Sequence, residues 1–170
     1  MCIRDRYENF PVGDPTDENT VVGPLSSEKQ FERVKGYIEK GIEEGAELIR
    51  GEVPEKNGKG YYVKPAIFTN VKPGMTIHDE EIFGPVLSII KVKDVEEAIK
   101  VANAVDYGLS SAVFGDNEKA IEIAKEIDAG ECYVNTSVKG PNLPFGGYKQ
   151  SGIGREGGLY GLLELSLIHI

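Results

Sequence analysis

The sequence has few of the residues that build metal centres and nucleophilic sites. Its 170 residues include 2 cysteines, 2 histidines and no tryptophan. Zinc sites draw three or four ligands from Cys, His and carboxylate side chains, so this scarcity argues against a bound metal. A Cys–His nucleophilic pair would need Cys132 to meet His78. Cys132 lies in an apolar stretch beside Tyr133 and Val134, which favours a buried, unreactive thiol.

Basic residues and long apolar runs are also scarce. The 19 Lys and Arg residues against 28 Asp and Glu residues give a formal charge of -9. Nucleic acids and anionic membranes would repel such a chain, so we expect neither as a partner. No apolar run approaches the roughly 20 residues that span a bilayer. Outside the terminal segments there is one cysteine and hence no internal disulfide, which fits a reducing compartment, and we expect a cytoplasmic protein.

The first half of the sequence predicts one amphipathic helix and several short strands. Ser27 is expected to cap the helix, and Gly45 to end it. The apolar face of this helix is expected to consist of Phe31, Val34, Ile38 and Ile42. Strands are expected at 47–50, 61–63 and 66–68, and Pro65 should place at least one of the last two at a sheet edge.

From Val86 onward, strands and helices alternate. Strands are predicted over 86–92, 110–114 and 132–134, with helices between them that begin at Asp94 and at Asp116 or Asn117. Strand–helix–strand units with short connections are typical of a parallel α/β sheet with flanking helices. Residues 136–161 are rich in glycine and are expected to form a long loop, which is where such folds place functional groups.

The segment Glu80-Glu81-Ile82-Phe83-Gly84-Pro85-Val86 joins two carboxylates, an aromatic residue and a rigid turn just before a strand. A carboxylate beside an aromatic residue suits a sugar-bearing heterocycle, because it accepts hydrogen bonds from hydroxyls while the ring packs on a flat surface. This segment resembles the Glu-Ile-Phe-Gly-Pro motif of the NAD(P)-dependent aldehyde dehydrogenases. The resemblance implies that Glu81 binds the nicotinamide ribose and that Phe83 lies against the cofactor, NAD or NADP. Glu80 is expected to be a solvated neighbour.

A second string, from Pro144-Phe145-Gly146-Gly147 through Gly154-Arg155-Glu156, is similar to the C-terminal signature of the same family. The resemblance covers nearly all of residues 7–164. It implies an aldehyde-dehydrogenase-like catalytic domain fragment in which Phe145 lies near the substrate tunnel. Arg155 and Glu156 are expected to form a structural pair, and Asn135 to bond the backbone at a strand end.

The resemblance also implies a mechanism in which a Cys thiolate attacks the aldehyde and a Glu base hydrolyses the resulting thioester. The family places both groups upstream of this segment, so we expect no catalytic nucleophile or base in the chain. An oligomerisation strand that would follow residue 164 is also missing, and we expect the full-length parent to be a homo-oligomer. The expected substrate is a small-molecule aldehyde that is oxidised to a carboxylic acid.

Two other readings remain open. The parent could be a semialdehyde dehydrogenase that forms an acyl-CoA, or a non-catalytic family member with a structural or binding role. The substrate is also open. Lys139 is either an attractor for an anionic substrate or a solvated loop lysine.

The two ends of the chain differ in character from the rest. Residues 165–170 can be encoded as CTG TCT CTT ATA CAC ATC, and the reverse complement of that string encodes the Met-Cys-Ile-Arg-Asp that opens the chain. One inverted DNA string at both ends resembles a transposon end or sequencing adapter. We therefore expect residues 1–6 and 165–170 to be non-native and residues 7–164 to be the native domain segment.

Overall fold

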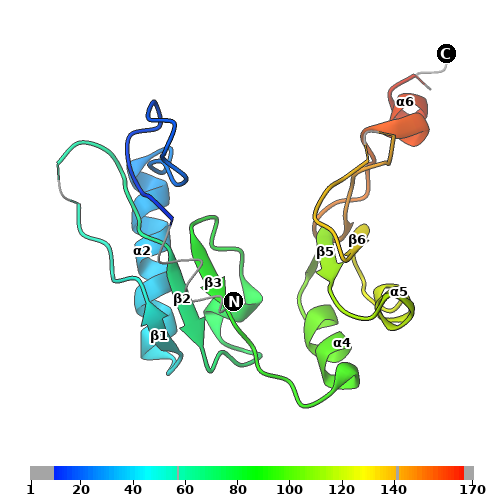
Figure 1. Cartoon of the computed structure of the whole chain (residues 1–170), viewed down its shortest axis with the longest axis horizontal. Helices are drawn as coiled ribbons and strands as arrows, with labels where there is room; N and C mark the ends of the chain where they lie inside the picture. Colours follow the sequence, from blue (N-terminus) through cyan, green and yellow to red (C-terminus); the bar gives the residue numbers. More distant parts are fainter. Residues whose placement is uncertain (1–9, 57, 141, 167–170) are drawn as a thin grey trace. The chain divides into compact units, whose positions relative to one another are not determined.

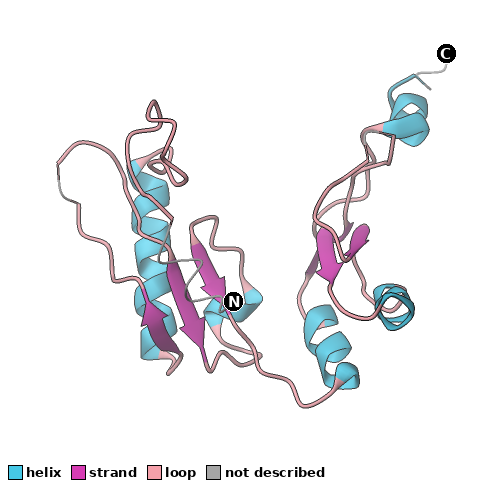
Figure 2. Cartoon of the chain, in the orientation of Figure 1, coloured by secondary structure: helices cyan, strands magenta, loops and turns pink. Residues whose placement is uncertain are grey.

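The computed structural model describes residues 10–56, 58–140 and 142–166. The predicted non-native segment 1–6 and most of segment 165–170 lie outside these residues. The chain divides into two units, Met1–Lys91 and Val92–Ile170. Figures 1 and 2 show the helices and strands of each unit. None of the described helices is long and apolar enough to cross a membrane.

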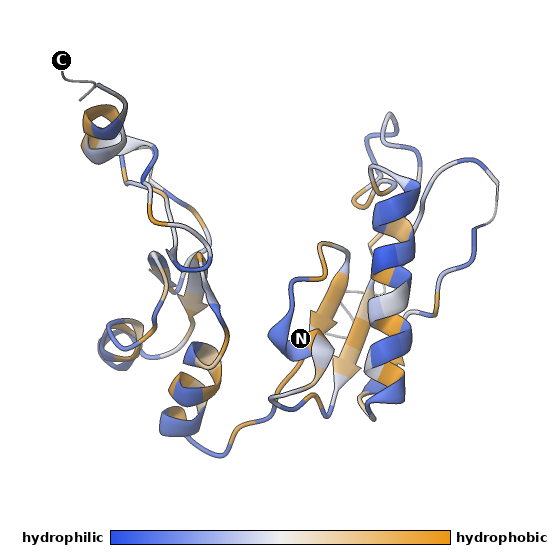
Figure 3. Cartoon of the chain, turned by 180° about the vertical axis from the view of Figure 1, so that it is seen from behind, coloured by the Kyte–Doolittle hydropathy of each residue, from blue (hydrophilic) through white to orange (hydrophobic). Residues whose placement is uncertain are grey.

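Helix α2 (Glu28–Glu43) forms one side of the first unit. The Ser27 hydroxyl accepts a hydrogen bond from the Gln30 N–H, and Gly45 follows the helix with a φ of 92°, so the predicted start and stop are confirmed. The predicted apolar face is confirmed for its first three residues, Phe31, Val34 and Ile38, which are buried. Hydrophobic and hydrophilic residues interleave along this helix in Figure 3.

The fourth residue of that face was predicted wrongly. Ile42 is exposed, and Gly41 is buried in its place. A Cβ at Gly41 would lie 2.9 Å from the Cδ1 of Ile77 and 3.2 Å from the Cε1 of Phe68. The helix therefore packs closely against Ile77 and Phe68 at Gly41, and a larger side chain at this position would require these neighbours to shift.

The sheet beside α2 has the order β1-β2-β3, with β1 at Glu47–Arg50, β2 at Ala66–Thr69 and β3 at Val86–Ser88. The β1 strand pairs antiparallel with β2, and β3 pairs parallel with β2. The strand after Pro65 is thus central, which contradicts an edge position for it. Tyr61 makes a single bridge to Leu25, so no strand forms at 61–63.

The hydrophobic core of the first unit lies between α2 and this sheet. Phe31, Val34 and Ile38 pack in one cluster with Ala66 and Phe68, all with at most 1% of their surface exposed. Alternation along β2 turns Ala66 and Phe68 to one face of the sheet. The cluster also contains Ala46, Val63, Val71, Ile77 and Ile82.

The second unit repeats a strand–helix pattern. Helix α4 (Val95–Asn103) begins at Asp94, whose carboxylate accepts a hydrogen bond from the Glu97 N–H. The strands β5 (Ser110–Val113) and β6 (Glu131–Val134) are parallel and are joined by α5 (Asn117–Ala124), which is capped by Asp116. These helices and the two later strands were predicted close to their observed bounds.

Two features of the predicted sheet and loop are corrected. One parallel sheet was expected to run from residue 86 to residue 134, but β3 pairs with β2 in the first unit while β5 pairs with β6 in the second. The long loop contains β7 (Tyr148–Lys149), which pairs antiparallel with β4 (Tyr107–Gly108), and it ends in helix α6 (Gly158–Ser166). Pairing between sequence-distant strands is non-local and leaves little trace in local hydrophobic spacing.

A prediction concerns Gly84, which lies against the core face of α2. A Cβ at Gly84 would lie 2.6 and 2.8 Å from the two γ carbons of Val34. Valine is stiff about χ1 and cannot move aside freely. We expect Gly84→Ala to lower the free energy of unfolding by about 1–3 kcal/mol in a urea titration.

The control for this experiment is Gly36→Ala, a substitution on helix α2 itself. No atom lies within 4 Å of the position that its Cβ would occupy. Ala is the better helix former, so this variant should be more stable by about 0.5–1 kcal/mol. Equal effects of the two substitutions would contradict the close approach of Gly84 to Val34.

Candidate functional site

The segment from Glu80 to Gly84 connects the short helix α3 (Thr76–Asp79) to β3. Glu44 holds the first turn of α3. Its carboxylate accepts hydrogen bonds from the Thr76 N–H at 2.7 Å and from the Thr76 hydroxyl at 2.6 Å. The hydroxyl bond is the main cause that lowers the pKa of Glu44 below its ordinary value of 4.5. The start of the motif is therefore anchored to the end of α2.

Helix α2 also binds the backbone of the motif itself. The Gln30 Nε2 donates to the carbonyl oxygens of Ile82 at 3.2 Å and Phe83 at 2.8 Å. The Arg33 Nη2 donates to the carbonyl of Glu81 at 2.8 Å. Gln30 and Arg33 are three residues apart and so share one helix face. These hydrogen bonds fix three successive backbone carbonyls. The directions of the side chains in the segment are then set by packing.

The two carboxylates of the motif differ in their partners. The Tyr37 hydroxyl donates to Glu80 at 2.7 Å, and this bond raises the pKa of Tyr37. Arg33 donates to the same tyrosine oxygen at 3.2 Å. Glu80 is exposed, as expected for a solvated neighbour, and it also belongs to a side-chain network through Tyr37. Within the described residues, the Glu81 carboxylate is exposed and has no hydrogen-bond donor.

The apolar residues of the motif are turned in opposite directions. Ile82 is buried in the core, whereas Phe83 is 68% exposed. Phe83 has a φ of 55°, a left-handed conformation that is uncommon for a bulky residue and persists only where its surroundings hold it. An exposed aromatic ring held in a strained turn is a feature of binding sites.

A shallow groove of about 380 Å³ runs along this segment. It is lined by Ile77, Glu80, Glu81, Ile82, Phe83, Gly84, Val86 and Ser88. The structure therefore brings the two predicted cofactor-facing residues, Glu81 and Phe83, to one groove. The arrangement offers a free carboxylate as a hydrogen-bond acceptor and an aromatic face for a flat ring.

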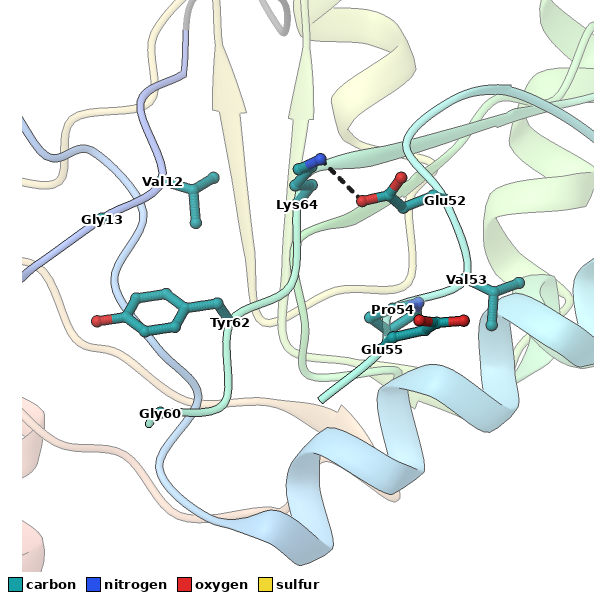
Figure 4. Close-up of a pocket in the computed structure, with 9 residues that line it drawn as sticks. All are labelled: Val12, Gly13, Glu52, Val53, Pro54, Glu55, Gly60, Tyr62 and Lys64. Atoms are coloured by element: carbon teal, nitrogen blue, oxygen red, sulfur yellow. Dashed lines mark ion pairs between the residues drawn. The ribbon is translucent and has the colours of Figure 1, made fainter. Parts of the chain in front are cut away.

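A larger pocket of about 560 Å³ lies elsewhere in the first unit (Figure 4). It lies between Val12 and Gly13 on one side and residues of the loop 52–64 on the other. Glu52 and Lys64 pair with each other there at 2.8 Å, so their charges balance. Volume alone does not indicate function, and this pocket contains none of the predicted site residues.

Phe145, the predicted substrate-facing residue, lies in the second unit. Its backbone is fixed by two hydrogen bonds with Glu156, at 2.7 and 2.8 Å. The Lys139 ammonium lies 4.4 Å from the centroid of its ring and 3.4 Å from the Glu131 carboxylate. Lys139 is therefore not a solvated loop lysine, which corrects one of the two expectations for it.

Two other sequence predictions have different outcomes. Asn135 bonds both backbone groups of Gly115, at 2.8 and 2.9 Å, as predicted. The predicted pair of Arg155 with Glu156 is wrong. The Arg155 guanidinium instead donates to the carbonyls of Gly147 and Gly154, both at 2.9 Å.

Sequence reasoning missed the residues of α2 that hold the motif. Gln30, Arg33 and Tyr37 lie at spacings of three and four and mark a polar stripe beside the apolar face. Such a stripe is usually a solvated helix surface, so the spacing alone did not distinguish it. Only the contact with residues 80–83 shows that the stripe binds another segment.

Comparison with known proteins gives consistent matches over nearly the whole chain. The model of the aldehyde dehydrogenase family matches residues 2–169. A Staphylococcus saprophyticus relative that carries the aldehyde dehydrogenase name is 50% identical over 166 residues, which are 96% of this chain and 35% of the relative. The chain thus spans about a third of the length of the curated relatives that it matches.

Solved structures give the same result. An aldehyde dehydrogenase of Mycobacterium tuberculosis in complex with NAD+ is 45% identical and superposes with a TM-score of 0.90, over 95% of this chain and 34% of that one. Aldehyde dehydrogenase C of Pseudomonas syringae, a cysteine-to-alanine mutant in complex with NAD+ and octanal, is 43% identical with a TM-score of 0.90, over 94% of this chain and 34% of that one.

A prediction follows from the bonds between Glu44 and α3. The pKa of Glu44 is lowered in the folded protein, so its contribution to stability is present above about pH 4.5 and is lost as pH falls through the lowered folded pKa. Glu44→Gln should therefore unfold at lower urea concentration than the unmodified chain at pH 7. The difference should shrink as the pH approaches 3.

The matched control is Glu43→Gln. Glu43 is the neighbouring carboxylate and makes only an exposed pair with Lys40 at 3.6 Å, so its replacement should have a small effect. A Glu44→Gln deficit that stayed constant from pH 7 to pH 3 would show that the charge of Glu44 is not what stabilises α3.

Proposed function

Because the chain belongs to the aldehyde dehydrogenase family, we propose that it is a segment of an enzyme that oxidises an aldehyde to a carboxylic acid with NAD+ or NADP+. Two observations beyond the family match support this function. The two solved relatives described above hold NAD+, and one of them also holds octanal. The groove at Glu81 and Phe83 has the chemistry that such a cofactor needs.

The residues of this groove fit a nicotinamide riboside. A ribose presents vicinal hydroxyls, for which the unpartnered Glu81 carboxylate is a charged acceptor. The exposed Phe83 ring offers an apolar face to the neighbouring heterocycle. We propose that Glu81 binds the ribose and that Phe83 packs against the cofactor. When bound, the nicotinamide supplies the hydride acceptor for the oxidation.

The single observation that carries this proposal is that the backbone carbonyls of the motif and its two carboxylates differ in their hydrogen-bond partners. Gln30 and Arg33 donate hydrogen bonds to the backbone carbonyls, and Tyr37 donates to Glu80. No donor among the described residues contacts the Glu81 carboxylate. A loop whose backbone is already fixed loses little backbone conformational entropy when a ligand binds to it. Helix α2 therefore acts as the support of the site.

Phe145 would face the aldehyde, while the cysteine nucleophile and the glutamate base would come from sequence outside this chain. The chain spans 35% of its curated relative, which leaves room for both. We further propose that the parent enzyme is a cytoplasmic homo-oligomer.

The role of Glu81 can be tested in the full-length enzyme that contains this chain. Glu81→Gln removes the charge that accepts the ribose hydrogen bonds and keeps the size of the side chain. A hydrogen bond to a charged group is worth about 1.5–3 kcal/mol, so the KM for the cofactor should rise by about tenfold or more. NADH or NADPH formation at varied cofactor concentration and saturating aldehyde measures this.

The control is Glu39→Gln, a change of an exposed carboxylate on α2 that pairs with Lys35 at 4.0 Å. It should leave the KM for the cofactor unchanged. If Glu81→Gln lowered kcat while the cofactor KM stayed constant, Glu81 would not be a ground-state cofactor ligand.

A separate prediction concerns the 170-residue chain by itself. It contains the proposed ribose-binding edge but not the proposed nucleophile or base. We expect no NADH formation above background when the purified chain is given NAD+ and a panel of aliphatic and aromatic aldehydes. Turnover by this chain would show that a residue within it performs the nucleophilic step.

A further inference from the structure

A charge-balanced cluster lies on one face of the Phe145 ring in the second unit and contacts the ring through Lys139. The Lys139 ammonium lies over one face of the ring, 4.4 Å from its centroid. The same ammonium lies 3.4 Å from one oxygen of Glu131. The other oxygen of Glu131 accepts a hydrogen bond from the Tyr133 hydroxyl at 2.8 Å. Both oxygens of the carboxylate are therefore in use.

The burial of this cluster makes its charges effective. The Glu131 side chain is 11% exposed and that of Lys139 is 31% exposed, whereas Lys93 in the same unit is 76% exposed. Water screens a pair at this depth less than a pair on the open surface. The bond to Glu131 raises the pKa of Tyr133, as expected when a hydroxyl donates to an ionised carboxylate.

We infer that Lys139 is a positioning residue for Phe145, and that the cluster selects uncharged aldehydes. This inference rests on the proposed function, because it takes Phe145 to lie beside the substrate. Lys139 has its charge matched by Glu131, so it is a poor receptor for an anionic aldehyde. It also occupies one face of the Phe145 ring, where a cationic group would otherwise bind.

Aromatic faces bind ammonium groups through their negative quadrupole. In Phe145 this attraction is already satisfied by Lys139, and a second cation nearby would be repelled by the first. An anionic aldehyde would have to compete with Glu131 for Lys139. An uncharged aldehyde meets neither penalty and can pack against the rest of the ring.

The first experiment tests the pairing without any enzymatic activity. The full-length enzyme that contains this chain is treated with limiting acetylating reagent, and the labelling rate of each lysine is measured by mass spectrometry. Lys139 should react more slowly than Lys93, and Glu131→Gln should accelerate labelling of Lys139 while leaving Lys93 unchanged. Equal rates at Lys139 and Lys93 in the unmodified enzyme would overturn the inference.

The second experiment tests selectivity in the full-length enzyme. Values of kcat/KM are compared for pentanal, succinic semialdehyde and betaine aldehyde, which are uncharged, anionic and cationic. Pentanal should be the best of the three. Glu131→Gln frees the ammonium and should raise the ratio of succinic semialdehyde to pentanal by about two- to fivefold. Lys139→Met removes the ammonium from the face of the Phe145 ring. It should raise the ratio of kcat/KM for betaine aldehyde to that for pentanal by a similar factor.

Two matched variants separate positioning from general damage. Lys139→Arg keeps a cation over the ring and beside Glu131, so its ratios should match those of the unmodified enzyme. Lys93→Met removes an exposed lysine of the same unit and should change neither ratio. A selective loss of succinic semialdehyde oxidation in Lys139→Met would overturn the inference and make Lys139 an anion receptor.

The outcomes also separate this inference from the proposed function. If the full-length enzyme oxidised none of the three aldehydes, the proposed function would fail, and the inferred selectivity would fail with it. The labelling result would then still decide whether Lys139 is held by Glu131. Oxidation with unchanged ratios in both variants would refute the selectivity alone.

Discussion

The backbone of residues 81–83 is held by side chains of a helix some 50 positions earlier in the sequence, and the candidate site depends on this constraint. Gln30 and Arg33 bind the three carbonyls of that segment, while Ile82 enters the core beneath. With the backbone fixed and Ile82 buried, Phe83 takes a left-handed conformation and its ring is exposed. The backbone geometry of the site is thus a consequence of helix–loop packing, and Gly84 allows the close approach to α2.

The two units differ in how far they can support themselves. The first has a continuous core between α2 and a three-stranded sheet. Among the described residues of the second unit, Ala120 is the one hydrophobic side chain in the buried core. Its strands form two-stranded sheets, which are marginal alone, and large apolar residues such as Phe114, Val138 and Ile153 are exposed. Such a surface suits a segment that packs against further polypeptide in a larger enzyme.

Local sequence signals predicted the features that depend on neighbouring residues. The caps act within three residues: those at Ser27 and Asp94 were confirmed, and of the two candidates Asp116 and Asn117 the structure has Asp116 as the cap. The partners of Glu80 and Arg155 were not predictable in this way. Their contacts join segments that are separated in the chain, or involve backbone carbonyls whose direction is unknown until the loop is built. Gly41 replaced Ile42 on the buried face for the same reason, since the crowding comes from Ile77 and Phe68.

The sequence by itself determined the family, the alternation of helices and strands, and the identity of Glu81, Phe83 and Phe145 as candidates. The resemblance of two motifs gave the family and these three candidates, and the alternation of helices and strands follows from residue types and short spacings. Only the tertiary structure decided which carboxylate is free, because that depends on the donors that other segments bring to Glu80 and Glu81. It likewise decided that Lys139 is matched by Glu131. A charge acts according to what surrounds it, and the surroundings exist only after folding.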